Sequence, residues 1–220
     1  PVNLKDNPPF KSEHGDGVSD LDKEVIYDWI RRADEHYEID VSRAARYLQR
    51  AIELDPQYAL SHYSLGRCYL ALGETELAEE SFLTALIEDV CPLRLLPSMR
   101  SFVDEFSNTQ NIAYLDLQGL LERRAESPIL GSEILVDHVH PSIQGHKIIG
   151  QDLAALIGES FMNEPVAPAW QSMRQSAYET HLKTLDELYY EHGNMRLENL
   201  RAWTKGESKG PPIEMHAPID

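Results

Sequence analysis

The sequence lacks a long apolar run, an excess of positive charge and a set of paired cysteines. No apolar stretch approaches the ~20 residues of a membrane-spanning helix, so we expect no membrane segment in this chain. The 20 Lys and Arg residues are outnumbered by 37 Asp and Glu, and the net charge of −17 argues against a nucleic-acid partner. Cys68 and Cys91 lie outside any Cys-x-x-Cys motif, so we expect two buried free thiols.

The chain is long and apolar enough to fold. With 220 residues, 42% of them hydrophobic, it can form one or two domains with a sizeable core. Residues 1–20 contain several helix-breaking residues between charges, which predicts an extended arm. These breakers are Pro1, Pro8, Pro9, Gly15 and Gly17. The arm is either a surface linker or a segment that places Phe10 in a neighbouring pocket.

Residues 21–90 show a repeated helical pattern. Its densest part contains Leu65, Gly66, Tyr69, Gly73, Ala78, Phe82 and Ala85. Thirty-four positions earlier, Ala44, Leu48 and Ala51 stand where Ala78, Phe82 and Ala85 stand. A small residue at a helix crossing allows close approach, and a large one a turn later fills the groove. The pattern resembles tetratricopeptide repeats and predicts helices at about 59–72 and 75–88.

The number of repeats bears on their role. Two repeats fall short of the three or more that a free-standing array usually needs. We therefore expect the hairpins to pack against the rest of the chain. Binding of a protein or peptide partner through the repeat helices is the alternative.

The pattern of apolar and turn-forming positions in residues 91–160 predicts a helix, a short strand and further helices. The apolar positions from Leu93 to Phe106 predict a helix that kinks at Pro97 or begins there. Residues 112–117 are typical of a short strand, and a helix is expected at about 118–124. The apolar run 134–136 then leads into a polar loop and another helix.

Asp137 precedes His140 by three positions on that loop. At this spacing the carboxylate can bind one imidazole nitrogen, fix the tautomer and leave the other nitrogen as a general base. Pro141 ends the extended segment, Ser142 can cap the next helix, and Gly145 permits close approach of another backbone. Asp137 and His140 are therefore the candidate catalytic residues.

Together with Gly145 and His146, this Asp-x-x-His-Pro stretch resembles the Asp-x-x-His block of the SGNH (GDSL) hydrolases. The resemblance implies a Ser-His-Asp triad that hydrolyses an ester of unknown type without a cofactor. His140 would take the proton of the serine and return it to the leaving group, while Asp137 holds the imidazole. The arm also resembles the segment that follows the oxyanion-hole strand in SGNH proteins with inserted helical repeats.

The serine that the resemblance requires is missing. Residues 15–17 read Gly-Asp-Gly instead of Gly-Asp-Ser, and Asn3 lies outside a Gly-x-Asn-Asp motif. We therefore expect the serine to precede Pro1, with this chain as the carboxy-terminal part of an esterase. One alternative is a repeat-based interaction module without catalysis. Another is a metal site with ligands from Asp137, His138, His140 and His146.

The expected fold is mainly α with a small α/β part. Tetratricopeptide hairpins at 21–90 follow the arm at 1–20, and the carboxy-terminal portion of an SGNH-like α/β domain occupies 91–160. Arg94 could reach its cleft or form a surface salt bridge. A helical tail occupies 161–220, with a linker near Pro165 and Pro168, a helix from about 169 to 191, a break at 192–194 and a last helix before a loose end.

Overall fold

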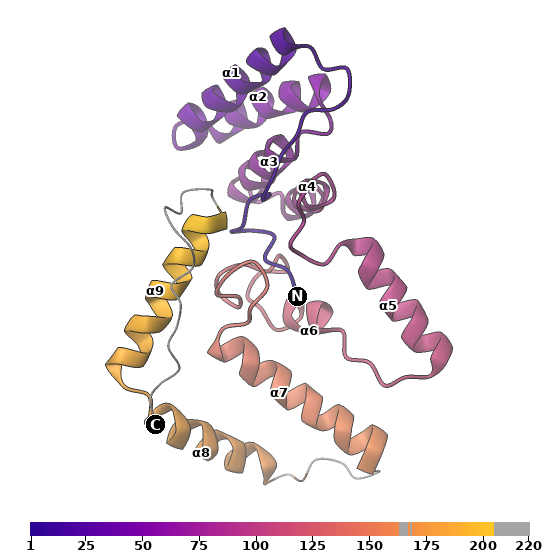
Figure 1. Cartoon of the computed structure of the whole chain (residues 1–220), viewed down its shortest axis with the longest axis vertical. Helices are drawn as coiled ribbons and strands as arrows, with labels where there is room; N and C mark the ends of the chain where they lie inside the picture. Colours follow the sequence, from indigo (N-terminus) through magenta and orange to yellow (C-terminus); the bar gives the residue numbers. More distant parts are fainter. Residues whose placement is uncertain (163–166, 168, 205–220) are drawn as a thin grey trace. The chain divides into compact units, whose positions relative to one another are not determined.

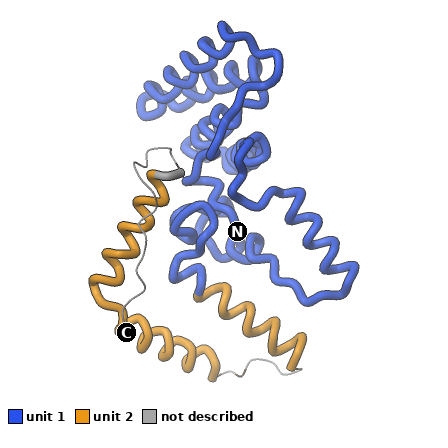
Figure 2. The backbone as a smooth tube through the Cα atoms, viewed as in Figure 1, with its two compact units in different colours: residues 1–146 blue, residues 147–220 orange. Residues whose placement is uncertain are grey.

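The computed structural model is mainly helical and describes residues 1–162, 167 and 169–204. Packing divides the chain into two compact units, residues 1–146 and 147–220 (Figure 2). Pro165 and Pro168 of the predicted linker, and the predicted loose end from Gly206, lie outside the described residues. In the described part of the chain, no helix combines the length and apolar character needed to cross a membrane.

Unit 1 opens with the arm, which has no helix before α1, and continues with helices that pack as neighbours along the chain (Figure 1). These are α1 (Asp20–Tyr37), α2 (Val41–Leu54), α3 (Ala59–Ala71) and α4 (Thr75–Ile87). Ser19 caps α1 by accepting the Asp22 N–H at 3.2 Å, and Asp40 caps α2 by accepting the Arg43 N–H at 2.9 Å. The helices predicted at about 59–72 and 75–88 are confirmed as α3 and α4.

The α3–α4 crossing depends on a glycine opposite a phenylalanine. Phe82 is 1% exposed, and a Cβ added to Gly66 would lie 2.8 Å from its Cδ1 atom. The ring thus occupies the space where Gly66 has no side chain. Gly73 makes the turn between the helices with φ of 80°, a conformation that L residues rarely adopt.

Two apolar clusters form the core of unit 1. The first joins α1, α2 and α3 and includes the buried Cys68. Cys91 is exposed, contrary to the expectation, because it lies in the α4–α5 connection rather than on a packed helix face. The second cluster places Val2 and Leu4 of the arm against α3 and α4 and against Ile129. The first residues of the arm therefore belong to the core, and the repeat helices pack against other parts of the chain, as expected.

The expected α/β part is not observed. Helix α5 (Pro97–Gln110) begins at Pro97, which is one of the two predicted alternatives, and α6 covers Leu117–Glu122. The strand predicted at 112–117 is an error: the described residues contain no strand, only an isolated bridge between Leu135 and Pro141. A strand needs a neighbour that supplies ladder hydrogen bonds, and strand-like composition alone does not provide one.

Helix α7 (Ile143–Ile157) continues as a π-helical turn over Gly158–Met162, and unit 2 then contains α8 (Trp170–Leu182) and α9 (Glu187–Thr204). The single helix predicted from 169 to 191 is therefore wrong, and the predicted break at 192–194 lies inside α9. Asp186 starts the second helix by accepting the Tyr189 N–H at 2.8 Å. Gly193 does not break α9, since one helical glycine costs only about 1 kcal/mol.

Candidate functional site

The candidate catalytic residues lie on the loop that precedes α7. Leu135 and Pro141 bridge its two sides, and the Ser142 N–H donates to Ile134 O at 2.8 Å. Ser142 Oγ accepts the Gly145 N–H at 3.2 Å in the first turn of α7, which confirms its predicted capping role. A Cβ on Gly145 would lie 2.9 Å from Ile134 O, so the predicted close approach is also confirmed.

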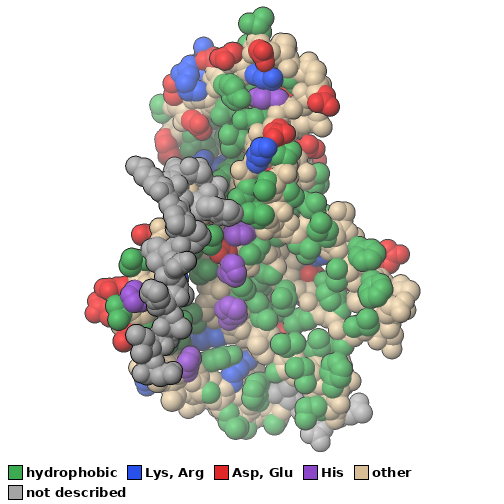
Figure 3. Space-filling view, in the orientation of Figure 1, with side chains coloured by type: hydrophobic (Ala, Val, Ile, Leu, Met, Phe, Trp, Pro, Cys, Tyr) green, Lys and Arg blue, Asp and Glu red, His purple; other side chains and the backbone are tan. Residues whose placement is uncertain are grey.

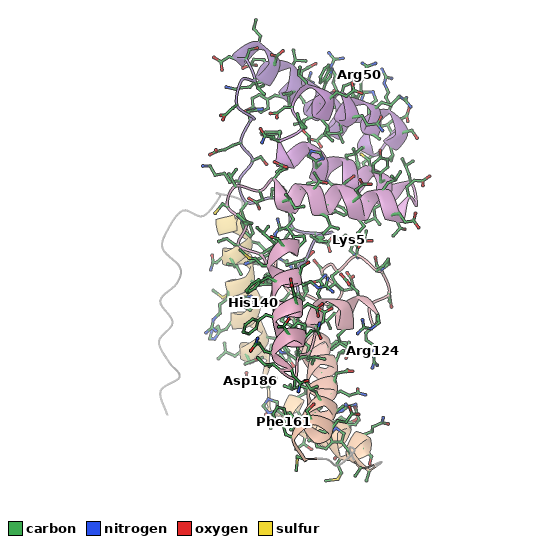
Figure 4. All side chains as sticks on the ribbon, turned by 90° about the vertical axis from the view of Figure 1, so that its right-hand side faces the viewer. Lys5, Arg50, Arg124, His140, Phe161 and Asp186 are labelled. Carbon is green, nitrogen blue, oxygen red and sulfur yellow. The ribbon has the colours of Figure 1, made fainter. Side chains whose placement is uncertain are left out.

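Asp137 and His140 form the hydrogen-bonded pair that their spacing predicts (Figure 4 labels His140). His140 Nδ1 lies 2.7 Å from Asp137 Oδ2, and the N–H groups of Val139 and His140 both donate to Asp137 Oδ1 at 2.8 Å. The Asp137 side chain is 6% exposed, whereas that of His140 is 67% exposed. An ionised carboxylate places the proton on Nδ1 and leaves Nε2 as a proton acceptor on an exposed ring.

The charge of Asp137 is set by competing effects. Burial raises the pKa of Asp137, but the backbone N–H groups of His140 and Val139 and the His140 ring together lower that pKa below its ordinary value. The carboxylate is therefore ionised at neutral pH. It can orient the imidazole and stabilise its protonated form.

The neighbouring His138 is buried and serves packing. Its Nδ1 has no hydrogen-bond partner and lies 3.8 Å from Asp137 Oδ1. The ring meets Phe10 edge-on at 5.1 Å, and burial lowers the pKa of His138. His146 lies exposed on α7. Among the described residues, no group of three or more His, Cys, Asp and Glu is placed to hold a metal ion, so the metal alternative has no site there.

Asn3 is a residue of this region whose role the sequence does not reveal. It is fully buried, its N–H donates to His138 O at 2.9 Å, and its Nδ2 donates to Asp137 O at 3.2 Å. Its Oδ1 accepts the Asp6 N–H at 2.9 Å. Asn3 follows Val2 and precedes Leu4 in a segment rich in prolines and charges, and nothing local indicates partners so distant along the chain.

Arg94 also has an unexpected place. It neither reaches the loop nor forms a surface salt bridge, because its side chain is 2% exposed and pairs with buried Asp89 at 3.3 Å. Its Nη1 donates to the carbonyls of Asn3 at 3.2 Å and Asn7 at 2.9 Å. Burial lowers the pKa of Arg94, although Asp89 opposes this shift. Asp89 in turn accepts the Phe10 N–H at 2.8 Å.

A second Asp–His pair joins the arm to the repeats. His14 Nδ1 lies 2.8 Å from fully buried Asp55, and its ring stacks on Tyr58 at 4.3 Å. Its Nε2 lies 2.9 Å from the Tyr27 hydroxyl, so both ring nitrogens are engaged. Asp55 also accepts the Gly15 N–H at 3.3 Å. Burial raises the pKa of Tyr58 to about 12. This pair fastens the arm and offers no free base.

Comparison with known families finds a match in the repeat helices. A model of the tetratricopeptide repeat matches residues 47–80, from within α2 through α3 into α4. This segment is similar to a tetratricopeptide repeat. Such repeats commonly mediate protein–protein interaction. The comparisons with curated proteins and with solved structures returned no match. The hydrolase resemblance of residues 91–158 stays a prediction.

Proposed function

We propose that the repeat helices α1–α4 form a protein-interaction module. The similarity of residues 47–80 to a tetratricopeptide repeat carries this proposal. Helix α2 offers a surface with a distinct chemistry: Arg43, Arg46 and Arg50 are exposed at helical spacing on one face, here called the α2 basic stripe. Arg50 projects from the surface of the repeats (Figure 4).

The α2 basic stripe favours an acidic partner segment. The ion pairs of the described repeat residues lie on α1 or at Asp55 and Asp89 and engage none of these three guanidinium groups. Arg43 instead donates from Nε to the Tyr47 hydroxyl at 3.3 Å, so Arg46 and Arg50 are the test positions. Basic side chains are exposed over the α1–α2 end of unit 1, among acidic ones (Figure 3). Guanidinium groups bind carboxylates in a bidentate geometry. The proposed partner therefore presents Asp or Glu side chains to α2.

Affinity capture from a lysate of the source organism, followed by quantitative mass spectrometry, tests this surface. The double variant Arg46→Glu/Arg50→Glu should lose the partner, and capture by the unchanged chain should weaken with added salt. The control is Arg31→Glu/Arg32→Glu, the same charge change on exposed α1 positions, which additionally breaks the ion pairs with Asp28 and Glu35. Equal capture by all three chains, or equal loss by both variants, would contradict a role for the α2 basic stripe.

We propose ester hydrolysis or acyl transfer as a second function, supported by the geometry of Asp137 and His140. His140 Nε2 takes the proton of a hydroxyl nucleophile and later returns it to the leaving group. Asp137 holds Nδ1 at 2.7 Å and stabilises the charged ring. In this proposal the nucleophile is a serine from outside these 220 residues.

Hydrolysis of p-nitrophenyl acetate by the product of the full gene tests the second function. The His140→Ala variant should lower kcat by about 10⁶-fold, because loss of the catalytic His alone costs a serine hydrolase about as much as loss of the whole triad. His36→Ala is the matched control, because His36 Nδ1 is also hydrogen-bonded, to Arg32 O at 2.8 Å. Equal rates for the unchanged protein and His140→Ala would remove the catalytic proposal.

A further inference from the structure

The arm segment, residues 2–15, is bound along its length by other parts of unit 1. In Figure 1 it runs from the amino terminus past α3 to the start of α1. At its first residues, the Val2 N–H donates to Gln118 Oε1 at 2.7 Å and the Leu4 N–H to Leu130 O at 3.1 Å. At its last, the Gly15 N–H donates to Asp55. An exposed linker would leave these groups to water.

Three contacts anchor the arm segment to the repeats. Val2 and Leu4 lie in the same apolar cluster as α3 and α4. The Tyr63 hydroxyl of α3 donates to Lys5 O at 3.0 Å. His14 binds the buried carboxylate of Asp55, which follows α2. The repeats therefore fix the arm segment at both of its ends.

The same segment also binds the loop that carries the candidate catalytic pair. Asn3 donates from its backbone to His138 O and from its side chain to Asp137 O. Phe10 adds a second contact. The centroid of its ring lies 5.1 Å from that of the His138 ring and 5.5 Å from Cζ of Arg94. Asn3 and Phe10 thus connect the arm segment to the loop. Arg94 contacts both residues, by a hydrogen bond to Asn3 O and by its position over the Phe10 ring.

We propose that the arm segment is the link through which the repeat helices hold the Asp137–His140 loop in its hydrogen-bonded geometry, with Asn3 as the positioning residue. The structural link does not depend on the proposed catalytic role of Asp137 and His140. Only its consequence for catalysis rests on that proposed function. It connects the two proposed functions, because the helices of the proposed interaction module and the loop of the proposed catalytic pair both bind the arm segment.

Amide hydrogen exchange of the full chain, followed by NMR, tests the link without any activity. The reporters are the N–H groups of Val139 and His140, which both bind Asp137 Oδ1. Asn3→Leu removes both side-chain hydrogen bonds while keeping the branched shape of the side chain, and it should accelerate both reporters about tenfold because their buried partners are left unsatisfied. His14→Ala should accelerate them in the same direction from the far end of the segment.

Two controls keep the test decisive. His36→Ala should leave both reporters unchanged, and the buried Ile26 of α1 should stay protected in every variant that is folded. If Asn3→Leu unfolds the chain, Tyr63→Phe replaces it, because it deletes only the hydroxyl that binds Lys5 O. The proposal is overturned if the Leu4 N–H exchanges faster in these variants while Val139 and His140 do not.

The outcomes separate this inference from the catalytic one. Accelerated reporters together with an inactive full-length protein would support the link and remove the ester-hydrolysis proposal. Unchanged reporters together with an activity that depends on His140 would remove the link and leave the catalytic pair. A link that serves catalysis also predicts that His14→Ala lowers kcat in proportion to the gain in exchange rate at the loop.

Discussion

Gly66→Ala should destabilise the natural chain yet stabilise a chain that carries Phe82→Ala. The added Cβ would lie 2.8 Å from Cδ1 and 2.9 Å from Cε1 of Phe82, a ring that is only 1% exposed and has little room to shift. Overpacking of this kind costs about 1–3 kcal/mol. The helix preference of Ala over Gly returns about 1 kcal/mol. We expect a net loss of about 1 kcal/mol in the free energy of unfolding.

Phe82→Ala removes the clash together with the ring. This change alone should cost about 3–5 kcal/mol. In its background Gly66→Ala retains only the helix preference and should stabilise by about 1 kcal/mol, so the two substitutions couple by about 2 kcal/mol. Urea unfolding followed by circular dichroism measures all four chains.

Gly73→Ala provides the control for this cycle. Its φ is 80° and an added Cβ would have nothing within 4 Å, so its penalty is conformational. We expect a loss of about 1–2 kcal/mol that is the same with and without Phe82. If Gly66→Ala also changed stability equally in both backgrounds, the close contact with the ring would not be the reason for glycine at the α3–α4 crossing.

Three further predictions follow from buried groups. Because burial raises the pKa of Cys68 to about 11, Ellman's reagent at pH 8 should label Cys91 in the native chain and Cys68 only after unfolding, as thiol counting by mass spectrometry will show. Arg94→Ala leaves Asp89 buried without its cation and should lower the free energy of unfolding in urea by about 3–5 kcal/mol. The lowered pKa of Asp137 stabilises its loop above the unfolded value of about 3.9, so NMR should show this order persisting at pH 5 and lost as the pH falls through the lower native value.

Local patterns predict well in this chain, and distant contacts do not. The helices α3 and α4 follow from periodic residues within each helix, and the contact of Asp137 with His140 needs only three residues of loop. Asn3, Arg94 and Asp55 instead meet partners that are 134, 91 and 41 positions away. Their side chains are polar, and nothing near them in the sequence names a partner so far away, so only the folded chain reveals these contacts.

The errors have two causes. Residues 112–117 have strand-like composition, but a strand also depends on a partner elsewhere in the chain, and the described residues supply none. In unit 2 two local signals compete for the break between helices: a helix-starting Asp at 186 and a glycine at 193. The cap at Asp186 ends the continuity of the helix, whereas one helical glycine is tolerated.

The contacts of the arm segment set an order of folding during synthesis. The helices α1–α4 contact their neighbours along the chain and can form as they leave the ribosome. Asn3 must wait for Asp137, which is made 134 residues later, a delay of roughly 7–27 s at ordinary elongation rates. For most of this interval Val2 and Leu4 have no complete apolar site, because Ile129 of their cluster is made only shortly before Asp137. The first residues of the arm segment therefore wait longer for their partners than the helices α1–α4 do.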